Sequence, residues 1–209
     1  MRFSISRGRA IVSALVAAAA ACAPLLANAG DGIDHRVNRN TGGIFAAQDV
    51  VPIALAVFSG GCALWEGTQT PIGKTCWESA ESIGISGLST EALQYLTGRQ
   101  GPSETSDPGR WFTGRKGTFP SLHVAVTTAA VTPFILNNFE SHPWLSSGLA
   151  LVPVYEMVAR VKAQQHWQTD VLAGALLGAG VGIGEVYKNS PFVFGLLPDG
   201  GFVGYHARF

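Results

Sequence analysis

Residues 170–187 read DVLAGALLGAGVGIGEVY, a run in which Gly174, Gly178 and Gly182 recur every four residues. On a helix this spacing places the three glycines along one stripe, where a second helix can approach closely. The run superficially resembles a dinucleotide-binding loop, but no strand precedes it, so helix packing explains it better. The run therefore predicts a long apolar helix in a tightly packed bundle.

Four other segments are expected to form helices, at 44–58, 90–97, 121–139 and 143–159. The first is expected to be buried and to end at Ser59-Gly60-Gly61, and the second to follow Ser89 as N-cap and to stop at Gly98. The predicted fold class is all-α, a helical bundle of five or six helices. A tail with Pro198-Asp199-Gly200-Gly201 between apolar stretches predicts a short C-terminal β-hairpin.

The chain begins with an expected secretory signal, residues 1–29. It has a basic start, an alanine-rich apolar run over 11–26 and a small-residue cleavage site at Ala27-Asn28-Ala29. The alternatives are an uncleaved membrane anchor, for which the run is short, and acylation at Cys22, which lacks the usual leucine or valine upstream. We therefore expect an exported, periplasmic protein in which residues 30–209 form one domain.

Charge and cysteine content narrow the classes of partner. Without the signal the chain has 11 Lys and Arg against 14 Asp and Glu, since residues 1–29 hold three arginines and no acid. A slightly acidic domain is a poor nucleic-acid binder, because nucleic acids favour a basic face. Cys62 and Cys76 are expected to form a disulfide in an exported protein, worth about 3 kcal/mol. Too few other ligands lie near them for a metal, so neither metal nor cofactor is expected.

The same composition leaves contact with a membrane open. Charged residues are scarce, and the expected helices are apolar nearly all round. None of the runs clearly reaches the roughly 20 residues that a spanning helix needs. A soluble bundle, or one lying against a membrane surface, is therefore slightly favoured over an embedded one, and the oligomeric state is open.

Residues suited to chemistry occur first in Phe119-Pro120-Ser121-Leu122-His123, at an expected helix start. Pro120 suits that position, and the N–H groups of residues 121–123 would have no intrahelical acceptor. They would point at a bound anion together with the Ser121 hydroxyl, and His123 could protonate a departing alkoxide. The loop before this motif, residues 98–118, concentrates positive charge and favours an anion; its cations are Arg99, Arg110, Arg115 and Lys116.

A second motif occupies residues 160–170, RVKAQQHWQTD. His166 and Asp170 are four residues apart, so a helix would bring them together, and a carboxylate on one ring nitrogen leaves the other free to attack phosphorus. Arg160 would face another way on a continuous helix, which predicts a turn between it and His166. A core histidine, a surface His–Asp pair or a capping arginine would each explain one residue, but the set favours phosphoryl transfer. The remaining histidines are expected to be structural or solvated: His35, His142 and His206.

These motifs resemble those of the type 2 phosphatidic acid phosphatase and vanadium haloperoxidase superfamily, K-x6-R-P, P-S-G-H and S-R-x5-H-x3-D. Residues 120–123 match the second motif, with leucine in place of glycine, and residues 159–170 match the third, with alanine in place of serine. The resemblance runs from about Leu88 to Tyr187. It implies an all-α core and no metal, and the haloperoxidase branch is disfavoured by the shortness of this chain.

The resemblance also implies roles for residues. His166 would carry a phosphohistidine, His123 would be the general acid and Asp170 the partner of His166. Phosphate would be bound by Arg160 and by the amides of the second motif, including those of Ser121 and Leu122.

This chain differs from the family pattern in the first motif. Pro102 aligns, but Gln94 stands in place of the lysine and Gly101 in place of the arginine. Arg99 is expected to substitute in part as a phosphate ligand, with Arg110, Arg115 and Lys116 as additional candidates. We expect a periplasmic phosphatase acting on lipid phosphates or small phosphate monoesters. The alternatives are a catalytically impaired relative that binds phosphate or lipid headgroups without turnover, and a structural envelope protein with no anion site.

Overall fold

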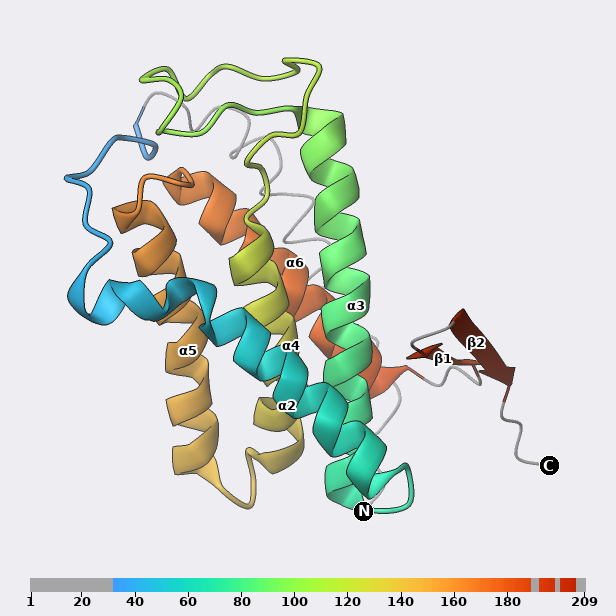
Figure 1. The fold of residues 1–209 in the computed structure, drawn as a ribbon. Coiled ribbons are helices and arrows are strands. Elements are labelled where there is room, and N and C mark those ends of the chain that lie inside the picture. Colours follow the sequence, from blue (N-terminus) through green and yellow to red (C-terminus); the bar gives the residue numbers. More distant parts are fainter. Residues whose placement is uncertain (1–31, 189–191, 198–199, 206–209) are drawn as a thin grey trace.

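The computed structural model describes residues 32–188, 192–197 and 200–205 (Figure 1). The expected signal at 1–29 lies outside them. The elements are η2 (Gly43–Asp49), α2 (Val51–Glu66), α3 (Pro71–Thr97), α4 (Leu122–Asn138), α5 (Pro143–Lys162), α6 (Gln168–Tyr187), β1 (Phe192–Leu197) and β2 (Gly200–Tyr205). Five α-helices and one 3-10 helix make up the described bundle, which confirms the predicted all-α class. The two strands pair antiparallel, with Leu197 opposite Gly200.

The centre of the bundle is α4, which packs against α2, α3, α5 and α6 (Figure 1). The glycine stripe of α6 faces it, as predicted: a Cβ atom at Gly174 would lie 2.6 Å from the carbonyl oxygen of Ser121, and one at Gly178 only 2.2 Å from that of Ala125. Glycine therefore lets the two backbones touch. At the site end this contact allows the Ser121 N–H to donate to the Asp170 carbonyl at 2.9 Å.

The expected end of the first helix at residues 59–61 was wrong, since α2 continues to Glu66. Packing on α3 outweighs the low helix propensity of its two glycines. The hydroxyls of Ser59 and Ser79 lie 2.8 Å apart, and the predicted disulfide between Cys62 and Cys76 joins the same two helices.

The prediction that this helix is buried was also wrong. Only one face of α2 packs inward, where Ser59 and Ala63 are buried, while Val57 and Leu64 on other faces are exposed. A run of apolar residues does not by itself distinguish these two situations.

The helix expected at 90–97 is the last part of α3, which begins at Pro71 after Thr70 as N-cap. Its predicted stop at Gly98 is confirmed, with φ of +49°. The early part was missed because its buried positions hold serine rather than apolar residues. Backbone carbonyls satisfy these hydroxyls: Ser79 donates to Ala130 at 2.7 Å and Ser82 to Glu78 at 2.6 Å.

The segments that carry the motifs gather at one end of the bundle (Figure 1). The loop from 98 to 121, the turn after α5 and the N-terminal segment 32–42 all lie there. The predicted turn is present, with Gln164 at φ +57°. The N-terminal segment is fastened to this turn and to α6, since the Asn40 N–H donates to Lys162 and the His35 N–H to the Gln168 side chain.

Among the described residues, α6 is long and apolar enough to cross a membrane, and η2 with α2 would count as a second span if that pair, bent by 48°, were taken as one. Core helices of soluble bundles share this length and composition.

Candidate active site

His166 follows the turn after α5 and is held by the loop before α4. Its Nδ1 lies 2.9 Å from the carbonyl oxygen of Thr118. A carbonyl can only accept, so Nδ1 carries a proton, and in the neutral form of the ring Nε2 keeps a lone pair. The Asp170 carboxylate lies 3.7 Å from Nδ1. The ring therefore has the tautomer that a nucleophile needs, with Thr118 rather than Asp170 as its direct hydrogen-bond partner.

Asp170 is fully buried and orders the groups around His166. Its Oδ2 accepts from the Thr118 hydroxyl at 2.9 Å and from the Trp167 N–H at 3.0 Å, and its Oδ1 accepts from Arg99. Burial alone would raise the pKa of this carboxyl, but attraction to His166 and Arg99 outweighs it, so the pKa is lowered. Asp170 is thus an ionised anchor that fixes Thr118, and Thr118 in turn fixes the ring of His166.

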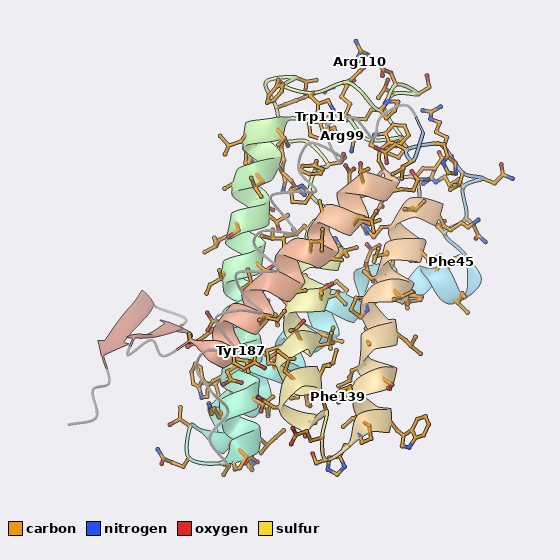
Figure 2. The ribbon with its side chains drawn as sticks, turned by 180° about the vertical axis from the view of Figure 1, so that it is seen from behind. Phe45, Arg99, Arg110, Trp111, Phe139 and Tyr187 are labelled. Atoms are coloured by element: carbon orange, nitrogen blue, oxygen red, sulfur yellow. A yellow bond between two sulfur atoms is a disulfide. The ribbon has the colours of Figure 1, made fainter. Side chains whose placement is uncertain are left out.

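Arg99 is placed differently from the expectation that it binds phosphate. All five of its N–H donors are used within the protein, by the Pro108 carbonyl twice, Thr169, Asp34 and Asp170. Its guanidinium carbon also lies 4.5 Å from the ring centre of Trp111 (Figure 2), and its side chain is 1% exposed. Arg99 has no donor left for a ligand, because acceptors within the protein use all five N–H groups and the carboxylates of Asp34 and Asp170 balance its charge.

The other three loop cations are exposed. Lys116 pairs with Glu91 at 2.6 Å, and Arg110 lies at the outer edge of the loop (Figure 2). No contact of the described residues joins Arg110, Arg115 or Lys116 to the motif side chains. The structure therefore gives these three no place beside His166.

Arg160 and His123 lie together, although 37 positions separate them. Arg160 donates to Oδ1 of Asp49 at 2.8 Å, and Nε2 of His123 lies 3.5 Å from the same oxygen. Burial lowers the pKa of His123 to about 4, helped by the nearby charges of Arg160 and His166. Burial also lowers the pKa of Arg160, but a guanidinium remains charged. The two motifs thus converge in space.

The start of α4 supplies further donors. The Ser121 N–H is already used by the Asp170 carbonyl, which differs from the expectation that it would be free. Leu122 and His123 are the first residues of the helix, so their N–H groups have no intrahelical acceptor. The Ser121 hydroxyl is fully buried and has no partner among the described residues, which suits it to a ligand oxygen.

The family's first-motif cations are absent because their positions serve other purposes. Gln94 is buried and donates to the Pro120 carbonyl at 2.8 Å, which supports the turn before Ser121. A Cβ atom at Gly101 would lie 2.7 Å from Cγ2 of Thr118 and 3.1 Å from the Gln165 carbonyl oxygen. An arginine does not fit there without moving the loop that holds His166.

Sequence reasoning missed Asp34, Asp49 and Thr118, which carry no motif signal. Glu156 was noticed only as one of two charges over 117–159, yet it lies one turn before Arg160 and is fully buried. Its carboxyl oxygens have no hydrogen-bond partner in the described part of the chain, and burial raises its pKa to about 7. No group of three or more His, Cys, Asp or Glu side chains that could hold a metal occurs among the described residues.

Comparison with known proteins identifies the family of this chain. The model of the PAP2 superfamily matches residues 76–191, more than half of the chain, so the chain belongs to this superfamily. A lipid A 1-phosphatase of Porphyromonas gingivalis is 29% identical over 118 residues, 56% of this chain and 24% of that protein. The chain thus spans about a quarter of the length of this relative. No solved structure matches.

Proposed function

We propose that this protein is an exported phosphatase that hydrolyses phosphate monoesters of lipids through a phosphohistidine on His166. The carrying observation is the convergence of His123 and Arg160, from two separate motifs, on one oxygen position. PAP2 membership supports the reaction class.

The proposed reaction has two steps, formation of a phosphohistidine and its hydrolysis. Nε2 of His166 attacks phosphorus, the bond to the alkoxide oxygen breaks, and His123 gives that oxygen a proton. Water then attacks the phosphohistidine and releases inorganic phosphate, while His123 takes a proton from the water. Arg160, the Ser121 hydroxyl and the first amides of α4 hold the non-bridging oxygens.

His123 must be protonated in the first step, although its pKa in the structure is about 4. Burial is the main cause of this low pKa, and repulsion by Arg160 adds to it. A phosphate dianion on Arg160 would counter both effects more strongly than the single charge of Asp49 does, because an adjacent negative charge raises the pKa of an imidazole. The substrate itself would thus charge the general acid.

Two observations favour a lipid as the alcohol part. The relative from Porphyromonas gingivalis is named for a lipid phosphate. In addition, α2 and α5 expose large apolar side chains, among them Ile53, Val57, Leu64, Trp65, Trp144, Leu151 and Val154. Exposed apolar surface of this extent is typical of proteins that contact membranes or partners. The apolar surface supports contact with a lipid surface, and the expected secretory signal at residues 1–29 is the basis for proposing a periplasmic location.

The test is phosphate release from an aryl phosphate and from a lipid phosphate by the purified protein. His166→Asn is expected to lower turnover on the order of 10⁴-fold or more. His142→Asn, outside both motifs, is the matched control and should keep full activity. Mass spectrometry after a rapid acid-free quench should find phosphate on His166. No phosphate release from either substrate by the wild-type protein would refute the proposal.

One observation favours a second candidate, a relative that binds phosphate without turnover. Gln94 and Gly101 replace two cations, and each charge-assisted hydrogen bond is worth about 1.5–3 kcal/mol. This candidate predicts that phosphate or vanadate binds, that Arg160→Gln abolishes the binding, and that no phosphohistidine forms. Detection of a phosphorylated His166 during turnover would exclude it.

A further inference from the structure

Asp49 lies in the site although no family motif includes it. It is the last residue of η2, 111 positions before Arg160. Its Oδ1 accepts a hydrogen bond from Arg160 at 2.8 Å and lies 3.5 Å from Nε2 of His123. One carboxylate oxygen thus contacts both the cation and the acid of the site.

The exposure of these three groups differs. The side chain of Arg160 is 8% exposed and that of His123 is 29% exposed, whereas that of Asp49 is 65% exposed. The carboxylate therefore covers the guanidinium from the solvent side. It can rotate into water, while the groups beneath it are held by the bundle.

The backbone that carries Asp49 is fixed by contacts of the residues just before it. The adjacent Gln48 is buried, and the Tyr155 hydroxyl donates to the Ile44 carbonyl at 2.6 Å, which ties η2 to α5. Removal of the carboxylate from Arg160 thus needs only a side-chain rotation, and the same side chain is available to return.

A carboxylate oxygen and a phosphate oxygen are both anionic acceptors that bind arginine in the same way. We propose that Asp49 is a competing internal ligand: its carboxylate occupies the position of a phosphate oxygen between Arg160 and His123, must leave when phosphate binds, and returns as phosphate leaves. The identity of the ligand rests on the proposed function.

The consequence is a lower apparent affinity for every anion that binds at Arg160. An internal competitor weakens every anion by the same factor, because each must first displace it. A lipid substrate also gains affinity from its apolar part, whereas inorganic phosphate has only the anion site. Asp49 would therefore lower the absolute affinity for inorganic phosphate and for the phosphate group of a substrate alike, and leave the ratio of the two affinities unchanged.

The experiment measures binding of inorganic phosphate by calorimetry, and inhibition of turnover by phosphate, for wild type, Asp49→Asn and Asp49→Ala. If Asp49 covers Arg160 for nine-tenths of the time, its removal should tighten phosphate binding on the order of tenfold. Glu104→Gln, which removes an exposed carboxylate from the loop at the same end, should leave the affinity unchanged. Thermal unfolding checks that each variant is folded.

Equal or weaker phosphate binding in both folded Asp49 variants would overturn this inference, and so would an equal gain in Glu104→Gln. If inorganic phosphate binds neither the wild-type protein nor the variants, both this inference and the proposed anion site are wrong. Turnover in the same samples separates the two proposals. Tighter phosphate binding by the Asp49 variants without any turnover would support the competing ligand and refute the phosphatase. Turnover with an unchanged phosphate affinity in these variants would support the phosphatase and refute the competing ligand.

Discussion

Arg99 and Arg160 are both buried at the same end of the bundle, with side chains 1% and 8% exposed, but their surroundings differ. Arg99 has two buried carboxylates and uses all five of its N–H donors inside the protein. Arg160 donates to one exposed carboxylate, and its Nε has no partner among the described residues. A guanidinium whose N–H groups all have partners inside the protein stabilises the fold. A guanidinium with a donor unused, beside an exposed carboxylate, can bind a ligand.

The largest effect is expected from Arg99→Ala. It would leave the Asp34 and Asp170 carboxylates buried without their cation, which costs about 3–5 kcal/mol. Urea unfolding followed by circular dichroism measures this loss. A change below 1 kcal/mol would show that Arg99 is not the structural member of the pair.

Arg160→Gln should have the opposite profile. We expect a small change in the free energy of unfolding and a loss of phosphate affinity of about 100-fold, because the charge-assisted hydrogen bonds to the ligand disappear. Calorimetric titration with phosphate, beside urea unfolding of the same variant, gives both values. A variant that unfolds readily but still binds phosphate would reverse the two roles.

Gly101→Arg restores the cation of the first family motif and tests whether a third arginine can join the site. Contacts with Thr118 and the Gln165 carbonyl leave no room, so we expect destabilisation of about 1–3 kcal/mol and lower activity. Gly101→Ala, measured in parallel, separates the clash from the charge. A gain in turnover in the arginine variant would contradict this reading of the loop.

Glu156→Gln is expected to have the smallest effect at acid pH, and an effect that grows as the pH rises. The pKa of Glu156 is raised from 4.5 to about 7, so the folded protein holds a proton that the unfolded chain loses between these values. That contribution to stability is complete below pH 4.5 and is lost as the pH rises through 7. The variant should match wild type near pH 4.5 and exceed it by about 3 kcal/mol at pH 8. Thermal unfolding across this range is the measurement.

Much of the fold followed from local patterns. Gly174, Gly178 and Gly182 predicted that another helix packs closely on α6, because four-residue spacing puts them on one face, but the spacing did not show that this helix is α4. Gly98 predicted the end of α3. The start of α3 was missed because Ser79, Ser82 and Ser86 make its buried side polar, and apolar periodicity cannot reveal such a core. The hydroxyls of Ser79 and Ser82 donate to backbone carbonyls, whereas that of Ser86 has no partner among the described residues.

The candidate site was predictable only where spacing along the chain is short. The turn before His166 and the closeness of His166 to Asp170 followed from the third motif. The partners of the two arginines did not, since Asp34 and Asp49 are brought in by tertiary packing from segments 65 and 111 positions away. The position of an arginine in the sequence does not show whether a carboxylate far away in the sequence forms an ion pair with it.

The family match begins at residue 76, after both of those acids. Asp34 accepts the Thr169 N–H and two further hydrogen bonds, from the Thr169 hydroxyl and Arg99, so the start of α6 is completed by an earlier segment. A fragment limited to residues 76–191 would contain the motifs but would lack Asp34 and Asp49, the carboxylates that make the surroundings of Arg99 and Arg160 different. Such a fragment would be a poor guide to the affinity of the whole domain for anions.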